Sequence, residues 1–448
     1  MSDLGDLCRA ALEAAADDEA VEAYAGQSRR TEVKARRGEV DSLSRSETRG
    51  VGVRLIAEGR LGYAWAADPD ADEVAELVAS AREGARHAAP DEANVLPSSQ
   101  TAPPLPGLFR EAQAGLGPER KVELALELDR AATSAHPDVD KVEEVIYADV
   151  VSRVAIASTA GVEAERTRTD CWCVVSALAE RDGETQSGFS FAVARELDEL
   201  DWRGAAAEAA ERGARLLGAR KPPTERVAVV LDPWAASSFL GVLAGALSAE
   251  EVQKGRSLFA DKVGERVGSD VLTLVDDGRL PDGPGSAPFD DEGVPTGRTP
   301  LIEAGNLRGF LHNAQTAARA GGRSTGNAGR AGYRSVPGVS PTNLVVEPGP
   351  EGPDDLLARA GRAVYVQSVT GVHSGANPVS GEFSVGATGL RVEGGALGEP
   401  LREMTIASTL QDVLGALASV GSDLRFFPGG GAIGTPTLLV GEMMVAGA

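Results

Sequence analysis

The chain has 448 residues, too long for one ordinary domain, so the length predicts two or three domains. It carries 44 basic and 67 acidic residues, and a formal net charge of −23 argues against binding along a nucleic-acid backbone. No apolar run approaches the length needed to cross a bilayer. We therefore expect neither nucleic acid nor a membrane as a partner.

The first twenty residues and the cysteines indicate the compartment. "MSDLGDLCRAALEAAADDEA" has neither the basic start nor the apolar stretch of a secretory signal. Three cysteines in so long a chain fit reduced thiols, so we expect a cytoplasmic protein. Cys171 and Cys173 alternate along a predicted strand and face the same side, which we interpret as two packed thiols rather than a metal site.

Residues 1–220 alternate between short strands and helices. Helical periodicity over residues 4–16 is followed by alternating segments, "AVEAYAG", "RTEVKARRG", "EVDSLSRSE" and "GVGVRLIAEGRLGYAWA", which predict an antiparallel meander. Turns are expected at Arg37-Gly38 and at residues 58–60. Helices are predicted over residues 70–87, 118–134 and 202–217, with three further strands between the last two.

Residues 218–223 contain the proline pair of "GARKPPTE", which ends a helix and marks the predicted boundary between domains 1–220 and 225–448. Beyond it we expect a buried strand "RVAVVLD", one long apolar helix over residues 233–255, a loop over 276–298 and a hairpin over 299–313. The fold class is therefore α+β, with two domains that each have a mainly antiparallel sheet flanked by helices.

Three patterns suggest chemistry but lack its context. Residues 322–326 match GxSxG, yet neither a strand before them nor a helix after them is predicted. Residues 429–434 match GxGxxG, yet a strand rather than a helix follows. Four histidines, His87, His136, His312 and His373, are too far apart in sequence to predict a metal site. His373 alone lies in a glycine-rich segment typical of functional loops.

Several long segments resemble the TldD/PmbA family, also called the modulator of DNA gyrase family, and specifically its PmbA (TldE) branch. They are "EVDSLSRSETRGVGVRLIAEGRLGYAWA", "STGNAGRAGYRSVPGVSPTNLVVEPG", "GVHSGANPVSGEFSVGATGLRVEGG" and "PLREMTIASTLQDVLGALASVGSD". They occur in the family's order over nearly the whole length. The gyrase label agrees poorly with the charge of −23.

The resemblance implies a two-subunit zinc peptidase in which the TldD subunit carries an HExxxH helix and a cysteine ligand. The matching helix here is "SSFLGVLAGALSAEEVQKG", with Leu240 and Gly245 at the histidine positions and Gly241 at the glutamate position. The cysteine region matches "FFPGGGAIGTP", which contains no cysteine. These residues cannot bind zinc, so the resemblance implies no catalytic residue, metal or cofactor in this chain. The zinc is expected in the partner.

The expected role is the non-catalytic subunit that completes a cavity for unfolded or modified peptides, with a TldD-like zinc subunit as partner. Residues 372–389 are expected to form a wall of that cavity, approaching whatever is bound there. The candidate residues facing substrate or partner are His373, Asn377, Ser380, Phe383, Asn313 and Asn327.

Two other functions remain open from sequence. One is an independent homo-oligomeric hydrolase of a small amide or peptide conjugate in specialised metabolism, which would hold metal by itself. The other is a regulator of DNA gyrase, which the acidic charge disfavours. Whether the chain forms a homodimer when alone, and what its substrate is, does not follow from sequence.

Overall fold

The structure is a computed structural model that describes residues 3–428 and 432–447. The chain divides into two compact units. The first contains Met1–Leu217 together with two short segments, Pro288–Pro295 and Arg330–Pro337, and the second contains the remainder. Both short segments lie within the predicted second domain, so the chain returns twice to the first unit after leaving it.

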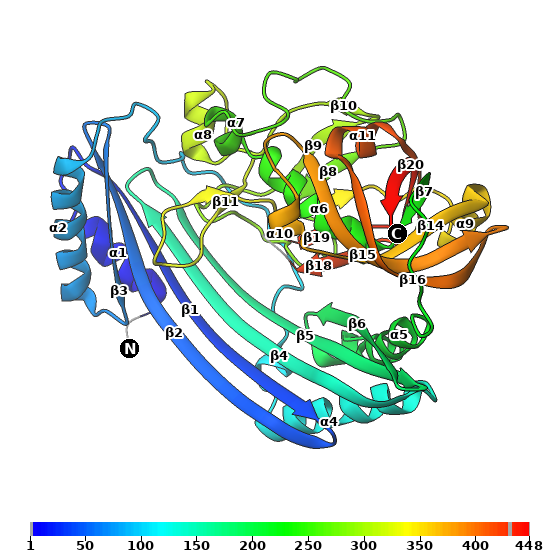
Figure 1. The fold of residues 1–448 in the computed structure, drawn as a ribbon. Coiled ribbons are helices and arrows are strands. Elements are labelled where there is room, and N and C mark those ends of the chain that lie inside the picture. Colours follow the sequence, from blue (N-terminus) through cyan, green and yellow to red (C-terminus); the bar gives the residue numbers. More distant parts are fainter. Residues whose placement is uncertain (1–2, 429–431, 448) are drawn as a thin grey trace. The chain divides into compact units, whose positions relative to one another are not determined.

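The first unit is built on one antiparallel six-stranded sheet in the order β3-β2-β1-β4-β5-β6 (Figure 1). Its strands are β1 Ala20–Arg36, β2 Glu39–Ala57, β3 Arg60–Ala67, β4 Val139–Ser158, β5 Glu163–Arg181 and β6 Glu184–Ala194. The helices are α1 Leu4–Glu13, α2 Ala71–His87, α3 Glu111–Ala114, α4 Pro118–Ala135 and α5 Trp202–Ala214, with a 3-10 turn at Leu197–Glu199.

The meander predicted at the start has fewer and longer strands than expected. "AVEAYAG" and "RTEVKARRG" form the single strand β1, and "EVDSLSRSE" and the following "GVGVRLIA" form the single strand β2. No proline or turn pair interrupts either segment, and β1 and β2 pair along almost their whole length. The turn at Arg37-Gly38 is confirmed, with positive φ at both residues (56° and 76°).

Helices cover the sheet of the first unit at two places, and each forms a hydrophobic core. Near one end, α1 and α2 bury Leu7, Val78 and Ala81 against β1, β2 and β4. Near the other, α4 and α5 bury Leu124, Leu128 and other apolar residues against β4 and β5. The acidic start predicted for α2 is a capping box, in which Asp70 accepts from the Glu73 amide and Glu73 from the Asp70 amide.

The second unit contains two larger sheets. One has the order β10-β9-β8-β13-β19-β18 and the other β16-β15-β14-β7-β20-β17. Because β16 also pairs with β20, the second sheet closes on itself. The strands are β7 Glu225–Leu231, β8 Leu274–Asp277, β9 Arg298–Glu303, β10 Asn306–Leu307, β11 Ala328–Gly329, β12 Gly338–Val339, β13 Asn343–Val346, β14 Arg362–Thr370, β15 Glu382–Glu393, β16 Ala396–Thr409, β17 Leu417–Val420, β18 Arg425–Pro428, β19 Ala432–Thr435 and β20 Leu438–Ala446.

The remaining helices are α6 Pro233–Ala246, α7 Ala249–Gln253, α8 Ala314–Arg319, α9 Pro353–Ala360, α10 Val372–Gly375 and α11 Leu410–Gly415. The single helix predicted over residues 233–255 is two helices, because Ser248 caps a new one by accepting from the Glu250 amide. The hairpin predicted over 299–313 ends early, at Leu307. Helix α6 packs into the largest core of the unit through Phe239, Leu240 and Leu243.

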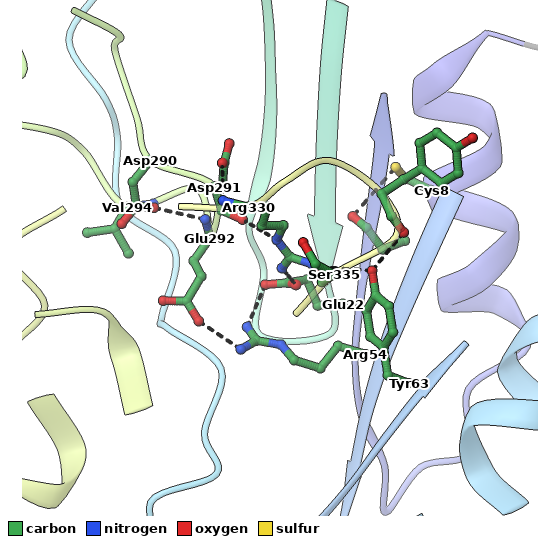
Figure 2. A network of polar contacts seen from close by, with 12 residues as sticks. Cys8, Glu22, Arg54, Tyr63, Asp290, Asp291, Glu292, Val294, Arg330 and Ser335 are labelled. Atoms are coloured by element: carbon green, nitrogen blue, oxygen red, sulfur yellow. Dashed lines mark hydrogen bonds and ion pairs between the residues drawn. The ribbon is translucent and has the colours of Figure 1, made fainter. Parts of the chain in front are cut away.

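Four buried charges inside the first unit join its sheet to the two returning segments (Figure 2). Arg54 on β2 lies 2.7 Å from Glu22 on β1 and 2.8 Å from Glu292. The other oxygen of Glu22 accepts from Arg330. All four side chains are at most 4% exposed. Burial alone would raise the pKa of Glu22, but Arg330 and Arg54 outweigh it and the pKa is lowered.

Further hydrogen bonds to the returning segments complete this network. Asp291 accepts from the Arg330 amide (2.8 Å) and from the Arg166 guanidinium (2.6 Å). The Tyr63 hydroxyl lies 2.8 Å from the Tyr333 carbonyl and 3.1 Å from that of Ser335. Arginine and glutamate side chains alternate in this network, so each buried charge contacts one of opposite sign. A buried charge without such a partner would be strongly destabilising.

Removing one member of this network should therefore destabilise the protein strongly. Arg54→Met leaves Glu22 and Glu292 short of a buried cation, and we expect a loss of about 3–5 kcal/mol in the free energy of unfolding. Lys141→Met is the control, because its ion pair with Glu180 is exposed at both ends and should be worth about 1 kcal/mol or less. Urea unfolding followed by circular dichroism measures both. Equal losses would contradict a structural role for the network.

Candidate functional site

Helix α6 carries the positions at which the family resemblance implies lost zinc ligands. Leu240 points into the core and is 3% exposed, whereas Gly241 and Gly245 lie on the accessible face. A Cβ at position 245 would meet no atom within 4 Å, and one at 241 would meet only Ile433. None of the three offers a donor atom, so these residues do not fit a zinc ion.

Other metal-binding side chains do not gather elsewhere in the described residues. Within 3–428 and 432–447, no three His, Cys, Asp or Glu side chains are placed to hold a metal ion. His87 contacts Glu83 on α2, and His136 accepts from the Asp138 amide after α4. Burial lowers the pKa of His312, whose Nδ1 has no hydrogen-bond partner among the described atoms. His373 is exposed on α10.

The glycine-rich segment 372–389 consists of helix α10, a turn and the first part of β15. The side chain of Asn377 accepts from the amides of Val379 (2.9 Å) and Ser380 (3.2 Å), so this residue shapes the turn. The Ser380 hydroxyl lies 3.3 Å from the Glu382 amide. His373, Asn377 and Ser380 lie at the surface around this turn, as side chains facing a substrate or partner would have to.

Two features of this segment differ from expectation. Phe383 is 4% exposed and its ring lies tilted against that of Phe239, with ring centroids 4.7 Å apart, so its apolar contact is with the core. At Gly389 a Cβ would lie 1.9 Å from the Tyr365 carbonyl, and at Gly381 one would lie 2.2 Å from the Gln411 side chain. The close approach that these glycines permit is therefore to the protein's own chain rather than to a bound molecule.

Asn313 and Asn327 are also internal. Asn313 is 3% exposed and caps α8, with its Oδ1 accepting from the Thr316 amide and hydroxyl. Asn327 is 1% exposed and donates to Asp276 at 2.6 Å. Thr342 donates to Asp276 twice, through its amide and its hydroxyl, each at 2.8 Å. Both asparagines therefore hold loops of the second unit in place, and we no longer expect either side chain to face a substrate directly.

Asp276 is a buried acid that none of the sequence motifs singled out. Burial raises its pKa to about 6, although the donors from Asn327 and Thr342 act in the opposite direction. It lies near the end of β8, in a stretch that was predicted to be a loop. The signal available in the sequence was "LTLVDD", a short apolar strand that ends in two acids.

The two remaining motifs do not form sites. Ser324 lies in a loop after α8, where its hydroxyl donates to the His312 carbonyl at 3.1 Å, and this is not the strand-to-helix turn of a nucleophile elbow. The GxGxxG match begins at residues 429–431, which lie outside the described residues. Its last residues enter strand β19, so no helix follows. The thiols of Cys171 and Cys173 are buried and unpaired by a disulfide, and burial raises the pKa of Cys173 to about 12.

Among the described residues, no helix has both the length and the apolar character needed to cross a membrane.

The fold and the family models define the class of this protein. Three models match successive parts of the chain: PmbA/TldA metallopeptidase domain 1 over residues 21–85, the central domain over 112–217 and the C-terminal domain over 224–447. The first unit contains the first two matches, and the second unit lies mostly within the third. The chain belongs to the PmbA/TldD metallopeptidase family.

Individual relatives agree with this assignment. "Metalloprotease PmbA" of Escherichia coli O157:H7 is 27% identical and aligns with 93% of this chain and 89% of its own length. An uncharacterized protein of Methanocaldococcus jannaschii is 31% identical over 77% of this chain and 78% of its own. A Thermotoga maritima structure, described as a candidate modulator of a DNA gyrase, is 26% identical, with a TM-score of 0.89 and 98% of each chain covered.

The structure of TldE from Thermococcus kodakarensis is 24% identical and has a TM-score of 0.90 over 99% of each chain, which shows a shared fold.

The raised pKa of Asp276 predicts a measurable pH dependence of stability. Because its folded pKa lies near 6, above an unfolded value of about 3.9, its contribution is complete below about pH 4 and declines as the pH rises through 6. We expect the free energy of unfolding of the wild type minus that of Asp276→Asn to fall from pH 4 to pH 7, because only the wild type loses stability as this acid ionises. Thermal unfolding across that range measures both proteins, and a value of wild type minus variant that rises with pH would contradict the assignment.

Proposed function

We propose that this chain is a non-catalytic, TldE-like subunit of a two-subunit zinc peptidase, in which the zinc and its ligands belong to a TldD-like partner. The observation that carries the proposal is that helix α6 lacks metal-binding side chains at the positions where the family resemblance implies them. The two histidine-equivalent positions are a buried leucine, Leu240, and an accessible glycine, Gly245, the glutamate-equivalent position is the accessible Gly241, and none of the three side chains has a donor atom. The cysteine-free sequence "FFPGGGAIGTP" agrees with the same loss.

In this proposal the chain binds and confines the substrate rather than cleaving it. The partner supplies the metal, which polarises the scissile carbonyl and activates a water molecule. Our chain contributes the accessible face of α6 and the surface turn of His373, Asn377 and Ser380 as part of the cavity wall. An unfolded or modified peptide fits such a role, because main-chain hydrogen bonds hold extended peptides with little sequence demand. We place the complex in the cytoplasm.

The direct test is reconstitution. We expect the purified chain alone to show no peptide cleavage, and the chain mixed with an HExxxH-bearing relative from the same organism to cleave an unfolded peptide in a chelator-sensitive reaction. A relative whose HExxxH glutamate is changed to glutamine is the control for contaminating proteases, because that change removes the base of the reaction. Zinc-dependent cleavage by our chain alone would instead favour the independent hydrolase.

A second prediction concerns the accessible face of α6. Gly245→Trp adds a large side chain into open space, so we expect the variant to fold normally. Because the side chain narrows the proposed cavity, the rate of peptide cleavage by the complex should fall at least about tenfold. Gly415→Trp on α11 is the matched control, because it too is an exposed helical glycine with no atom within 4 Å of its Cβ position. Comparable activity of the two variants, measured after checking equal thermal stability, would argue against α6 as a wall.

A further inference from the structure

Strand β5 of the first unit has an open edge. Its partner β6 pairs only with residues 171–181, so residues 163–170 have β4 on one side and no strand on the other. Among the described residues, the one backbone hydrogen bond on the open side is donated by the Thr169 amide to the Leu108 carbonyl at 3.0 Å. The loop around Leu108 therefore contacts this edge at a single main-chain group.

The direction of the Thr169 amide fixes which other groups face outward. In an antiparallel strand, alternate residues direct both N–H and C=O to the same side. Glu163, Glu165 and Thr167 therefore present their main-chain groups on the open side with Thr169. Within the described chain, no loop or side-chain group forms a hydrogen bond with the amide of any of these three residues. An edge of about 16 Å is thus left unpaired.

A cleft of about 650 Å³ lies along this edge. Residues of the proline-rich loop 99–109 also line it, together with Phe289 and Gly293 of a returning segment. Arg166 holds Phe289 in place, because its guanidinium donates to the Phe289 carbonyl at 2.6 Å and lies over the Phe289 ring. The volume is within the range of about 300–1,000 Å³ for ligand pockets.

The lining mixes polar and apolar residues and includes two carboxylates. Its apolar members include Ala102, Leu105, Leu108, Phe109, Val162 and Phe289. Glu163 and Glu165 are 79% and 51% exposed, and each has a cation only at 3.8 Å, Arg9 and Arg153 respectively. Such loose surface pairs are weak, so a cation on a ligand can compete for both carboxylates.

We propose that this cleft binds an extended peptide segment that adds to the edge of β5 as a strand and carries an apolar side chain next to a lysine or arginine. The ligand class rests on the proposed function, in which unfolded peptides are the substrates. Main-chain pairing with Glu163, Glu165 and Thr167 would supply most of the binding, as in other cases of strand addition, and the lining would select the side chains.

Fluorescence anisotropy tests the proposal on the full chain alone, without partner or zinc. The probe is a labelled octapeptide of alternating valine and lysine, compared with versions N-methylated on either alternate set of amides. Only one set can face β5, so we expect one methylated version to bind at least about tenfold more weakly and the other to bind nearly as well as the parent. Equal binding of all three peptides, or no binding of the parent, would overturn the proposal.

Variants of the edge give an independent readout. Thr167→Pro removes one outward N–H without breaking the ladder to β4, because proline is tolerated at a strand edge. We expect it to weaken binding about tenfold, whereas Thr167→Val, which keeps the N–H, should bind as wild type. Glu165→Gln should lower the affinity for the valine–lysine peptide about threefold or more. Its affinity for a valine–glutamate peptide should be unchanged or higher. Identical affinities for proline and valine variants would contradict strand addition.

These outcomes separate this inference from the proposed function. Binding with the expected amide pattern but no cleavage in the reconstituted complex would leave the cleft in place and remove the peptidase role. Cleavage without binding at β5 would do the reverse.

Discussion

The alternating chain of Arg330, Glu22, Arg54 and Glu292 is the interaction on which the architecture of the first unit depends. It joins strands β1 and β2 to two segments that are more than two hundred residues later in sequence. Each ion is buried, so the cost of desolvation is offset only when all four are present. The first unit is therefore completed by residues from the second half of the chain, and a chain truncated near residue 217 would leave Glu22 and Arg54 short of partners.

The second unit depends instead on apolar packing around α6, and the same packing explains its chemistry. Leu240 contributes to the core, while the opposite face of the helix is reduced to Gly241 and Gly245. The helix buries the position of one histidine and leaves the other histidine position and the glutamate position without side chains, which fits the cavity wall that we propose. Family membership is compatible with the lack of ligands on this helix if, as we propose, a partner carries the chemistry.

Local patterns in the sequence predicted local structure well. The acids before α2 and the turn at Arg37-Gly38 are both set by neighbouring residues. The contacts of Phe383, Asn327 and Gly389 could not be predicted in this way, because each depends on a segment distant in sequence. The sequence does contain a signal for the buried network, because Arg54 is a single charged residue within the apolar segment "GVGVRLIA".

The most direct test of the central claim is a count of zinc in each subunit and in their complex. The chain and an HExxxH-bearing relative would be purified separately, loaded with zinc, dialysed and analysed by mass spectrometry, then mixed and isolated by size exclusion. We expect no stoichiometric zinc in this chain, one zinc in the relative and one in the complex. One zinc bound per molecule of this chain alone would contradict it.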